Sequence, residues 1–139
     1  LDLDDANWRE PGVVREQNES QSVVAGFAAK SAWIVEGVYE PLLETALTRA
    51  THLIWLDLSW AECREGLLQR GEHYGMDPAD ARDLRNWEGA HRERRPAQAR
   101  MFDEFRGRKW RLRSRQALNR FADEAQSGEF LGRPVRSLA

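Results

Sequence analysis

Residues 52–58, HLIWLDL, and the following residues 59–70, SWAECREGLLQR, decide the fold class of this chain. The first stretch is a short apolar run, which predicts a buried strand. The second has helical apolar spacing, with Ser59 as a candidate helix cap and Gly75 as the expected stop. A strand followed directly by a helix is the repeating unit of α/β proteins.

The same alternation extends toward the N-terminus. Residues 32–39, AWIVEGVY, predict a second buried strand, and residues 1–4, LDLD, resemble the end of another. Residues 15–31 and 41–50 predict the helices between them, with Pro41 at a favourable first helical position. Strands that alternate with helices of this length predict a parallel sheet with crossover helices.

The C-terminal half has a different texture. Residues 77–108 are rich in arginine and predict two short helices broken near Pro96. Residues 109–115 alternate as a strand does, and residues 116–125 predict a short amphipathic helix. We expect residues 126–139 to form an extended surface tail, which a second subunit could cover in a homodimer.

Composition bounds the class of protein. With 139 residues, of which 41% are hydrophobic and 32% charged, the chain suits one packed domain over residues 1–139. No stretch approaches the apolar length of a membrane helix and no leader is recognisable, so we expect a cytoplasmic protein with no membrane partner. The single Cys63 favours a small packing residue over a nucleophile.

Charge is divided along the chain. Residues 1–80 carry fifteen acidic and six basic side chains, whereas residues 82–120 carry thirteen basic and five acidic ones. Most of these bases are arginine, whose planar fork suits bidentate contacts to phosphate or carboxylate. The second segment therefore predicts an anion site, although a solvated helix face pairing with the acidic half is an alternative.

Candidate site residues follow the predicted strands. Ligands of parallel sheets bind beyond the carboxyl ends of the strands, where the sequence has Asp4, Asp5, Glu36, Gly37 and Asp57. Acids in such positions can hold Mg²⁺ through its bound water. Gly37 has no side chain and could let a substrate approach the backbone. The alternative is that these are polar residues at loop starts.

Three blocks resemble P-loop kinases of the adenylate-kinase-like group, particularly the small proteins labelled DNA topology modulation proteins. The first block, residues 3–12, is similar to their Leu-Asp, Trp and Pro-Gly pattern at Leu3, Asp4, Trp8, Pro11 and Gly12. The second, WIVEGVY, is similar at Trp33, Gly37 and Tyr39, with Glu36 in place of Asp and Val38 in place of Asn. The third is residues 53–70, with a Leu-Asp pair and a terminal Arg70.

The resemblance implies a three-layer P-loop sheet of strand order 2-3-1-4-5, with residues 77–108 as an arginine-rich helical lid. The first strand and phosphate loop of such kinases precede the segment with which this chain starts. No G-x-x-x-x-G-K-[ST] motif occurs, and the two lysines, Lys30 and Lys109, lie outside any glycine-rich loop. We therefore expect that loop upstream; a diverged relative in which residues 32–39 and 52–58 pair directly is the alternative.

The resemblance also implies ATP and Mg²⁺ as cofactors. Asp4 and Glu36 would hold magnesium waters or orient the acceptor, with Asp5 as an alternative to Asp4. Trp8 and Tyr39 could contact the acceptor, or Trp8 could serve packing alone.

Arginines supply the remaining roles implied by the resemblance. Arg70 matches a lid-boundary arginine that contacts nucleotide phosphates in such kinases. Among Arg92, Arg94 and Arg95 we expect one or two to reach the transferring phosphoryl group, with Arg94 as the catalytic candidate.

The expected function is ATP-dependent phosphoryl transfer to a small molecule, nucleoside or nucleotide. True adenylate kinases have an arginine where this chain reads Tyr39-Glu40-Pro41, so the acceptor pocket differs. A nucleic-acid-binding module is an alternative, since Trp87 and Trp110 lie among the arginines and could stack on bases. A non-catalytic P-loop relative is another.

Overall fold

The computed structural model describes residues 1–10, 12–73 and 81–126, with the side chains of residues 70–73 and 81–83 left undescribed. The chain is mixed α/β, with helix predominating. It divides into two compact units. The first unit comprises Leu1–Leu53 and Ala97–Gly107, and the second comprises Ile54–Pro96 and Arg108–Ala139.

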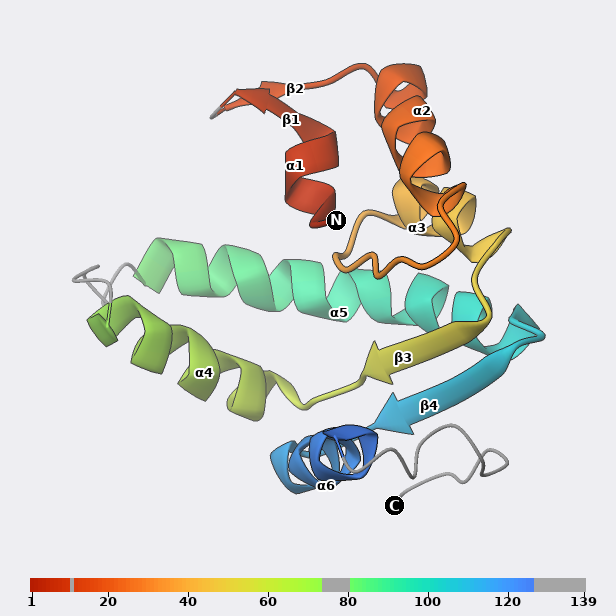
Figure 1. Cartoon of the computed structure of the whole chain (residues 1–139). Helices are drawn as coiled ribbons and strands as arrows, with labels where there is room; N and C mark the ends of the chain where they lie inside the picture. Colours follow the sequence, from red (N-terminus) through yellow and green to blue (C-terminus); the bar gives the residue numbers. More distant parts are fainter. Residues whose placement is uncertain (11, 74–80, 127–139) are drawn as a thin grey trace. The chain divides into compact units, whose positions relative to one another are not determined.

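The first unit is largely helical (Figure 1). Its β1 and β2 form an antiparallel pair. The elements that lie wholly within it are α1 (Leu3–Asn7), β1 (Trp8–Glu10), β2 (Val13–Val14), α2 (Gln17–Ala28) and α3 (Glu40–Leu47).

The start of the chain runs parallel to residues 34–36. The Leu1 amine donates to the Ile34 carbonyl at 2.8 Å, the Glu36 amide to the Leu1 carbonyl at 3.0 Å, and the Leu3 amide to the Glu36 carbonyl at 2.8 Å. A parallel bridge joins Asp2 to Glu36. The two segments are therefore parallel neighbours over these few residues.

Neither segment extends into a full strand, so the predictions of strands over residues 1–4 and 32–39 are wrong in extent. Asp2 ends the first one, because its carboxylate accepts a hydrogen bond from the Asp4 amide at 2.8 Å and caps α1. The second has no further ladder partner in the described part of the chain, and its Ile34 is 80% exposed.

The core of the first unit packs α2 and α3 on α1. Its buried residues are Leu3, Ala6, Val24, Leu42 and Ala46. These positions recur at helical spacing, which is why the helices predicted over residues 15–31 and 41–50 are confirmed as α2 and α3. Pro41 lies in the first turn of α3, as expected.

The elements of the remaining chain are β3 (His52–Leu56), α4 (Trp60–His73), α5 (Ala81–Glu104), β4 (Arg108–Leu112) and α6 (Arg115–Gln126). β3 and β4 are hydrogen-bonded neighbours that run in the same direction (Figure 1). The strands predicted over residues 52–58 and 109–115 are thereby confirmed, with ends shifted by a few residues. The helix predicted over residues 116–125 is α6.

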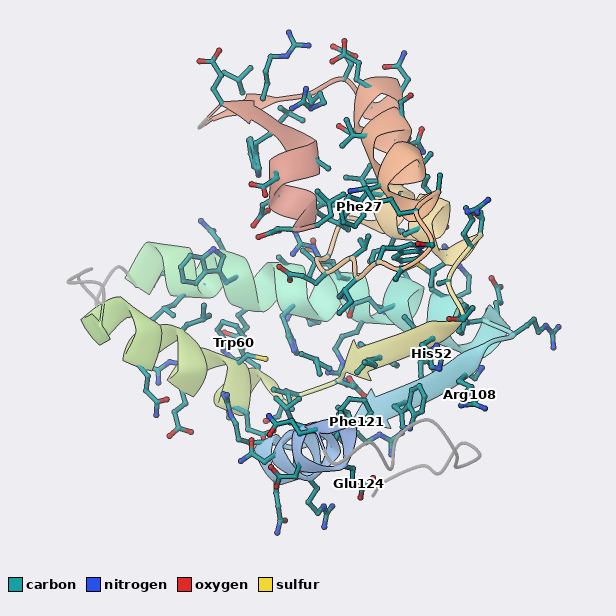
Figure 2. All side chains as sticks on the ribbon, in the orientation of Figure 1. Phe27, His52, Trp60, Arg108, Phe121 and Glu124 are labelled. Atoms are coloured by element: carbon teal, nitrogen blue, oxygen red, sulfur yellow. The ribbon has the colours of Figure 1, made fainter. Side chains whose placement is uncertain are left out.

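The core of the second unit lies between β4 and α6. Trp110, Leu112 and Phe121 are buried together, and the Trp110 and Phe121 rings meet edge to face with centroids 5.7 Å apart. Figure 2 shows Phe121 on the side of α6 next to β4. Because strand residues alternate between faces, burial of Trp110 and Leu112 leaves Arg111 and Arg113 on the opposite face of β4.

A capping box begins α4. The Ser59 hydroxyl accepts from the Glu62 amide at 3.3 Å, while the Glu62 carboxylate accepts from the Ser59 amide at 3.2 Å. The same carboxylate accepts from the Arg115 amide at 2.9 Å, at the start of α6. Ser59 is therefore the predicted cap, whereas Gly75, the predicted stop, lies outside the described residues.

The prediction of two helices broken at Pro96 is wrong, since α5 is one helix with Pro96 inside it. Proline removes one amide donor, here the one that would bond the Arg92 carbonyl, four residues earlier. The flanking turns are rich in strong helix formers, which allows the helix to continue through this single defect. Of the predicted lid, residues 77–80 lie outside the described chain, as do residues 127–139 of the predicted tail.

Candidate functional site

A hydrogen-bonded network in the first unit joins three of the residues singled out in the sequence. The Tyr39 hydroxyl donates to Oδ1 of Asp4 at 2.5 Å. It also accepts from the indole N–H of Trp8 at 3.1 Å. We call these three residues the Asp4 network.

Element ends position the Asp4 network. Asp4 lies in the first turn of α1, Trp8 follows the last residue of that helix, and Tyr39 precedes α3. The Trp8 amide donates to the Asp4 carbonyl, so one helical turn fixes the spacing of these two. Tyr39 packs against the buried core of the unit, which holds its hydroxyl toward Asp4.

Glu36 joins this region through its backbone. Its amide and carbonyl bond Leu1 and Leu3, so Glu36 and Asp4 follow neighbouring parallel segments. The side chains of Glu36, Asp4 and Asp5 are exposed. No group of three or more His, Cys, Asp or Glu side chains among the described residues is placed to hold a metal ion directly.

Gly37 has a packing reason of its own. Its φ is +146°, and a Cβ built there would lie 2.6 Å from the Leu3 Cβ. The Leu3 side chain therefore occupies the space that a side chain at position 37 would need. The role in substrate approach stays a prediction.

A second cluster surrounds Asp57, directly after β3, and we call it the Asp57 cluster. The Asp57 side chain is only 2% exposed. Arg111 Nε donates to its Oδ2 at 2.7 Å, Arg95 Nη2 lies 2.5 Å from its Oδ1, and Arg113 Nε lies 3.9 Å from Oδ2. The Arg95 contact is an ion pair without hydrogen-bond geometry, since Oδ1 has no hydrogen-bond donor within the described chain.

Further contacts hold the arginines of this cluster. The Arg111 guanidinium lies over the Trp55 ring, 4.2 Å from its centroid. Arg95 Nη1 and His91 Nε2 each donate to the Leu58 carbonyl at 3.2 Å. The His91 ring also lies 5.8 Å from that of Trp60, which Figure 2 shows between α4 and α5.

The other predicted arginines are placed differently. Arg92 and Arg94 are exposed on α5, and their side chains form no ion pair or hydrogen bond with the described residues. Arg70 lies in α4, but its side chain is outside the described part. Sequence reasoning missed Arg111 and Arg113, although the alternation of KWRLRSR puts them on one face and could have found them.

Two groups beside the α4 terminus have shifted pKa values. Backbone hydrogen bonding from Arg115, followed by hydrogen bonds from Ser59, holds the pKa of Glu62 below its ordinary value. Burial, and next the charge of Glu62, raises the pKa of Cys63. A raised pKa disfavours the thiolate, which agrees with a packing role for Cys63.

No helix in the described ranges is long and apolar enough to cross a membrane. No protein-family model, curated protein or solved structure matches the chain. The Asp4 network and the Asp57 cluster are therefore described by their own geometry and chemistry.

Proposed function

We propose that this chain is part of an ATP-dependent phosphotransferase related to the adenylate-kinase-like P-loop kinases, with a small molecule, nucleoside or nucleotide as acceptor. The observation that carries the proposal is the parallel pairing of residues 1–3 with residues 34–36, because it brings Asp4 and Glu36 to neighbouring segment ends. Ligands of parallel sheets bind at such ends.

In this proposal Asp4 and Glu36 hold the waters of a magnesium ion bound to ATP, and Asp5 can replace Asp4. A magnesium ion held there would neutralise charge that develops as the γ-phosphoryl group is transferred from ATP to the acceptor oxygen, with ADP as the leaving group. Tyr39 orients the Asp4 carboxylate through its hydroxyl, and Tyr39 and Trp8 border the acceptor.

The finer fold proposed is a three-layer P-loop sheet of order 2-3-1-4-5. The parallel contact of residues 1–3 with 34–36 agrees with the neighbours 2 and 3, and the β3–β4 pair agrees with the neighbours 4 and 5. The proposal requires a central strand and a glycine-rich loop outside these 139 residues. In it, Arg70, Arg92 and Arg95 bind nucleotide phosphates and Arg94 contacts the transferring group.

The test is phosphoryl transfer, measured as ADP formation by the full-length protein with Mg-ATP and a panel of nucleosides, nucleoside monophosphates and small alcohols. D4N and E36Q should each lower the rate by about 100-fold while leaving the thermal midpoint close to that of the unmodified protein. E10Q is the matched control, because Glu10 is an exposed carboxylate of the same unit. Equal rates in all three variants would contradict the proposal.

Nucleic-acid binding is the second candidate, favoured by Trp87, which is 44% exposed on the arginine-rich α5. Exposed aromatics beside arginines suit stacking and phosphate contacts. Retention on single-stranded DNA that falls steeply with salt, and that W87A weakens, would support it. Binding of Mg-ATP without transfer would instead identify a non-catalytic relative.

A further inference from the structure

The Asp57 cluster holds more positive charge than it neutralises. Three guanidinium groups approach one carboxylate within 4 Å. No other acidic side chain of the described residues forms an ion pair with Arg95, Arg111 or Arg113. The cluster therefore carries a formal excess of two positive charges.

Two of the three guanidinium groups that carry this excess positive charge are partly shielded from water. The side chains of Arg95 and Arg111 are 37% and 29% exposed, while that of Arg113 is 55% exposed. Like charges that lie close together at a protein surface repel one another. A bound anion would reduce this repulsion. An isolated surface arginine in water has no comparable repulsion for an anion to reduce.

Two of the three guanidinium groups, those of Arg95 and Arg111, are held in place by contacts within the cluster. Arg111 uses Nε for Asp57 and stacks on Trp55, and Arg95 uses Nη1 for the Leu58 carbonyl. Within the described chain, the Nη atoms of Arg111 and all nitrogens of Arg113 have no hydrogen-bond partner. Guanidinium groups held in this way bind oxyanions with little further loss of side-chain entropy.

We infer that Arg95, Arg111 and Arg113 form a binding site for a phosphoryl group, with Asp57 as the residue that positions them. A phosphate monoester carries close to two negative charges at neutral pH and three acceptor oxygens, which matches the excess of two charges. A carboxylate would neutralise only one. The site rests on this cluster alone and does not need the proposed transfer activity.

The test measures the thermal midpoint of the full chain in inorganic phosphate, against sodium chloride of equal ionic strength and sodium acetate. Phosphate should raise the midpoint above both, because it binds the folded state. R113Q should weaken the apparent phosphate affinity by about tenfold, since it removes one charge-assisted contact. Because Arg113 is exposed, R113Q should fold as the unmodified chain does, and R111Q serves as a second variant.

R64Q is the matched control, because Arg64 is an exposed arginine of α4 without an ion pair among the described residues. It should retain the phosphate effect in full. Equal midpoints in phosphate and chloride, or equal loss in R113Q and R64Q, would overturn the inference. Pyrophosphate and AMP form further arms of the titration, and tighter binding of AMP than of phosphate identifies a nucleotide as the source of the phosphoryl group.

Different results would contradict the phosphoryl-binding site and the proposed kinase activity. Phosphate binding that depends on Arg113, in a protein that transfers nothing from Mg-ATP, supports the site and rejects the kinase. Transfer that depends on Asp4, in a protein whose midpoint ignores phosphate, does the reverse.

Discussion

At the scale of single residues, Tyr39 links two predicted site residues through one hydroxyl. Tyr39→Phe removes the donor to Asp4 and the acceptor for Trp8. We expect a loss of stability of about 1 kcal/mol and a fall in phosphoryl transfer, because the carboxylate loses its orientation. Urea unfolding and the transfer assay measure the two effects.

Trp8→Phe is the control for this prediction. It removes the indole donor but leaves the hydrogen bond between Tyr39 and Asp4. Its transfer rate should therefore stay above that of Tyr39→Phe. Equal rates for the two variants would show that the Asp4 contact has no catalytic importance.

Glu62 gives a residue-level prediction about pH. Its pKa in the folded chain lies below the ordinary value of 4.5, because its carboxylate accepts hydrogen bonds from the Arg115 amide and from Ser59. Its contribution to stability is therefore complete above the unfolded pKa and is lost as the pH falls through the folded pKa. Thermal midpoints between neutral and acidic pH should fall more for the unmodified chain than for Glu62→Gln.

The pH dependence of the thermal midpoint can also contradict this prediction. Parallel midpoint curves for the two proteins would mean that the carboxylate makes no charge-dependent contribution to the starts of α4 and α6. Glu65→Gln is a suitable control, since Glu65 is an exposed acid one turn further along α4.

At the scale of elements, periodicity predicted what local residues determine. α2, α3, α4 and α6 have apolar residues at helical spacing, and β3 and β4 are short apolar or alternating runs. Start signals are present at α3, with Pro41, and at α4, with Ser59. These elements form where expected. Their positions depend little on which partner covers them.

The wrong predictions of elements have different physical reasons. Residues 32–39 have the composition of a strand, yet only Glu36 bridges, because a strand exists through its ladder. Asp2 converts LDLD from a strand end into a helix cap. α5 continues through Pro96 because the remaining hydrogen bonds of this long helix outweigh the one that proline removes.

The approach of residues 34–37 to α1 leads to a prediction at this scale. Gly37→Ala should destabilise the chain by about 2 kcal/mol, because the new Cβ meets Leu3 and φ is unfavourable for alanine. Gly26→Ala is the matched control, since Gly26 lies in α2, a Cβ added there would meet nothing within 4 Å, and alanine favours helix. Denaturant midpoints that fall equally in both variants would contradict the packing argument.

At the scale of the whole molecule, the candidate sites were predicted only in part. Sequence placed Asp4, Trp8 and Tyr39 in one site, and the structure brings them into one network. It did not pair Arg95 with Asp57, because the sequence separation of ion-pair partners carries no signal. The alternation of KWRLRSR puts Arg111 and Arg113 on one face, but it does not indicate that Arg111 pairs with Asp57, which follows a different strand.

Acidic and basic side chains are unevenly distributed along the whole chain. The arginine-rich segment predicted either an anion site or a solvated face that pairs with the acidic half of the chain. Three of its arginines pair with Asp57 and Arg100 pairs with Glu40, so the described ion pairs agree with the second alternative and the anion site stays a proposal. The excess positive charge of the arginine-rich segment is thus partly concentrated in the Asp57 cluster. Arg92 and Arg94 remain exposed on α5 and available to a ligand.

The most direct test of the central claim is the thermal midpoint of the full-length protein in the presence and absence of Mg-ATP. Millimolar nucleotide acting on a micromolar site should stabilise the fold by about 4 kcal/mol and raise the midpoint by several degrees. The account predicts a shift that needs magnesium and that D4N and E36Q reduce. No magnesium-dependent shift in a protein with an intact glycine-rich loop would contradict it.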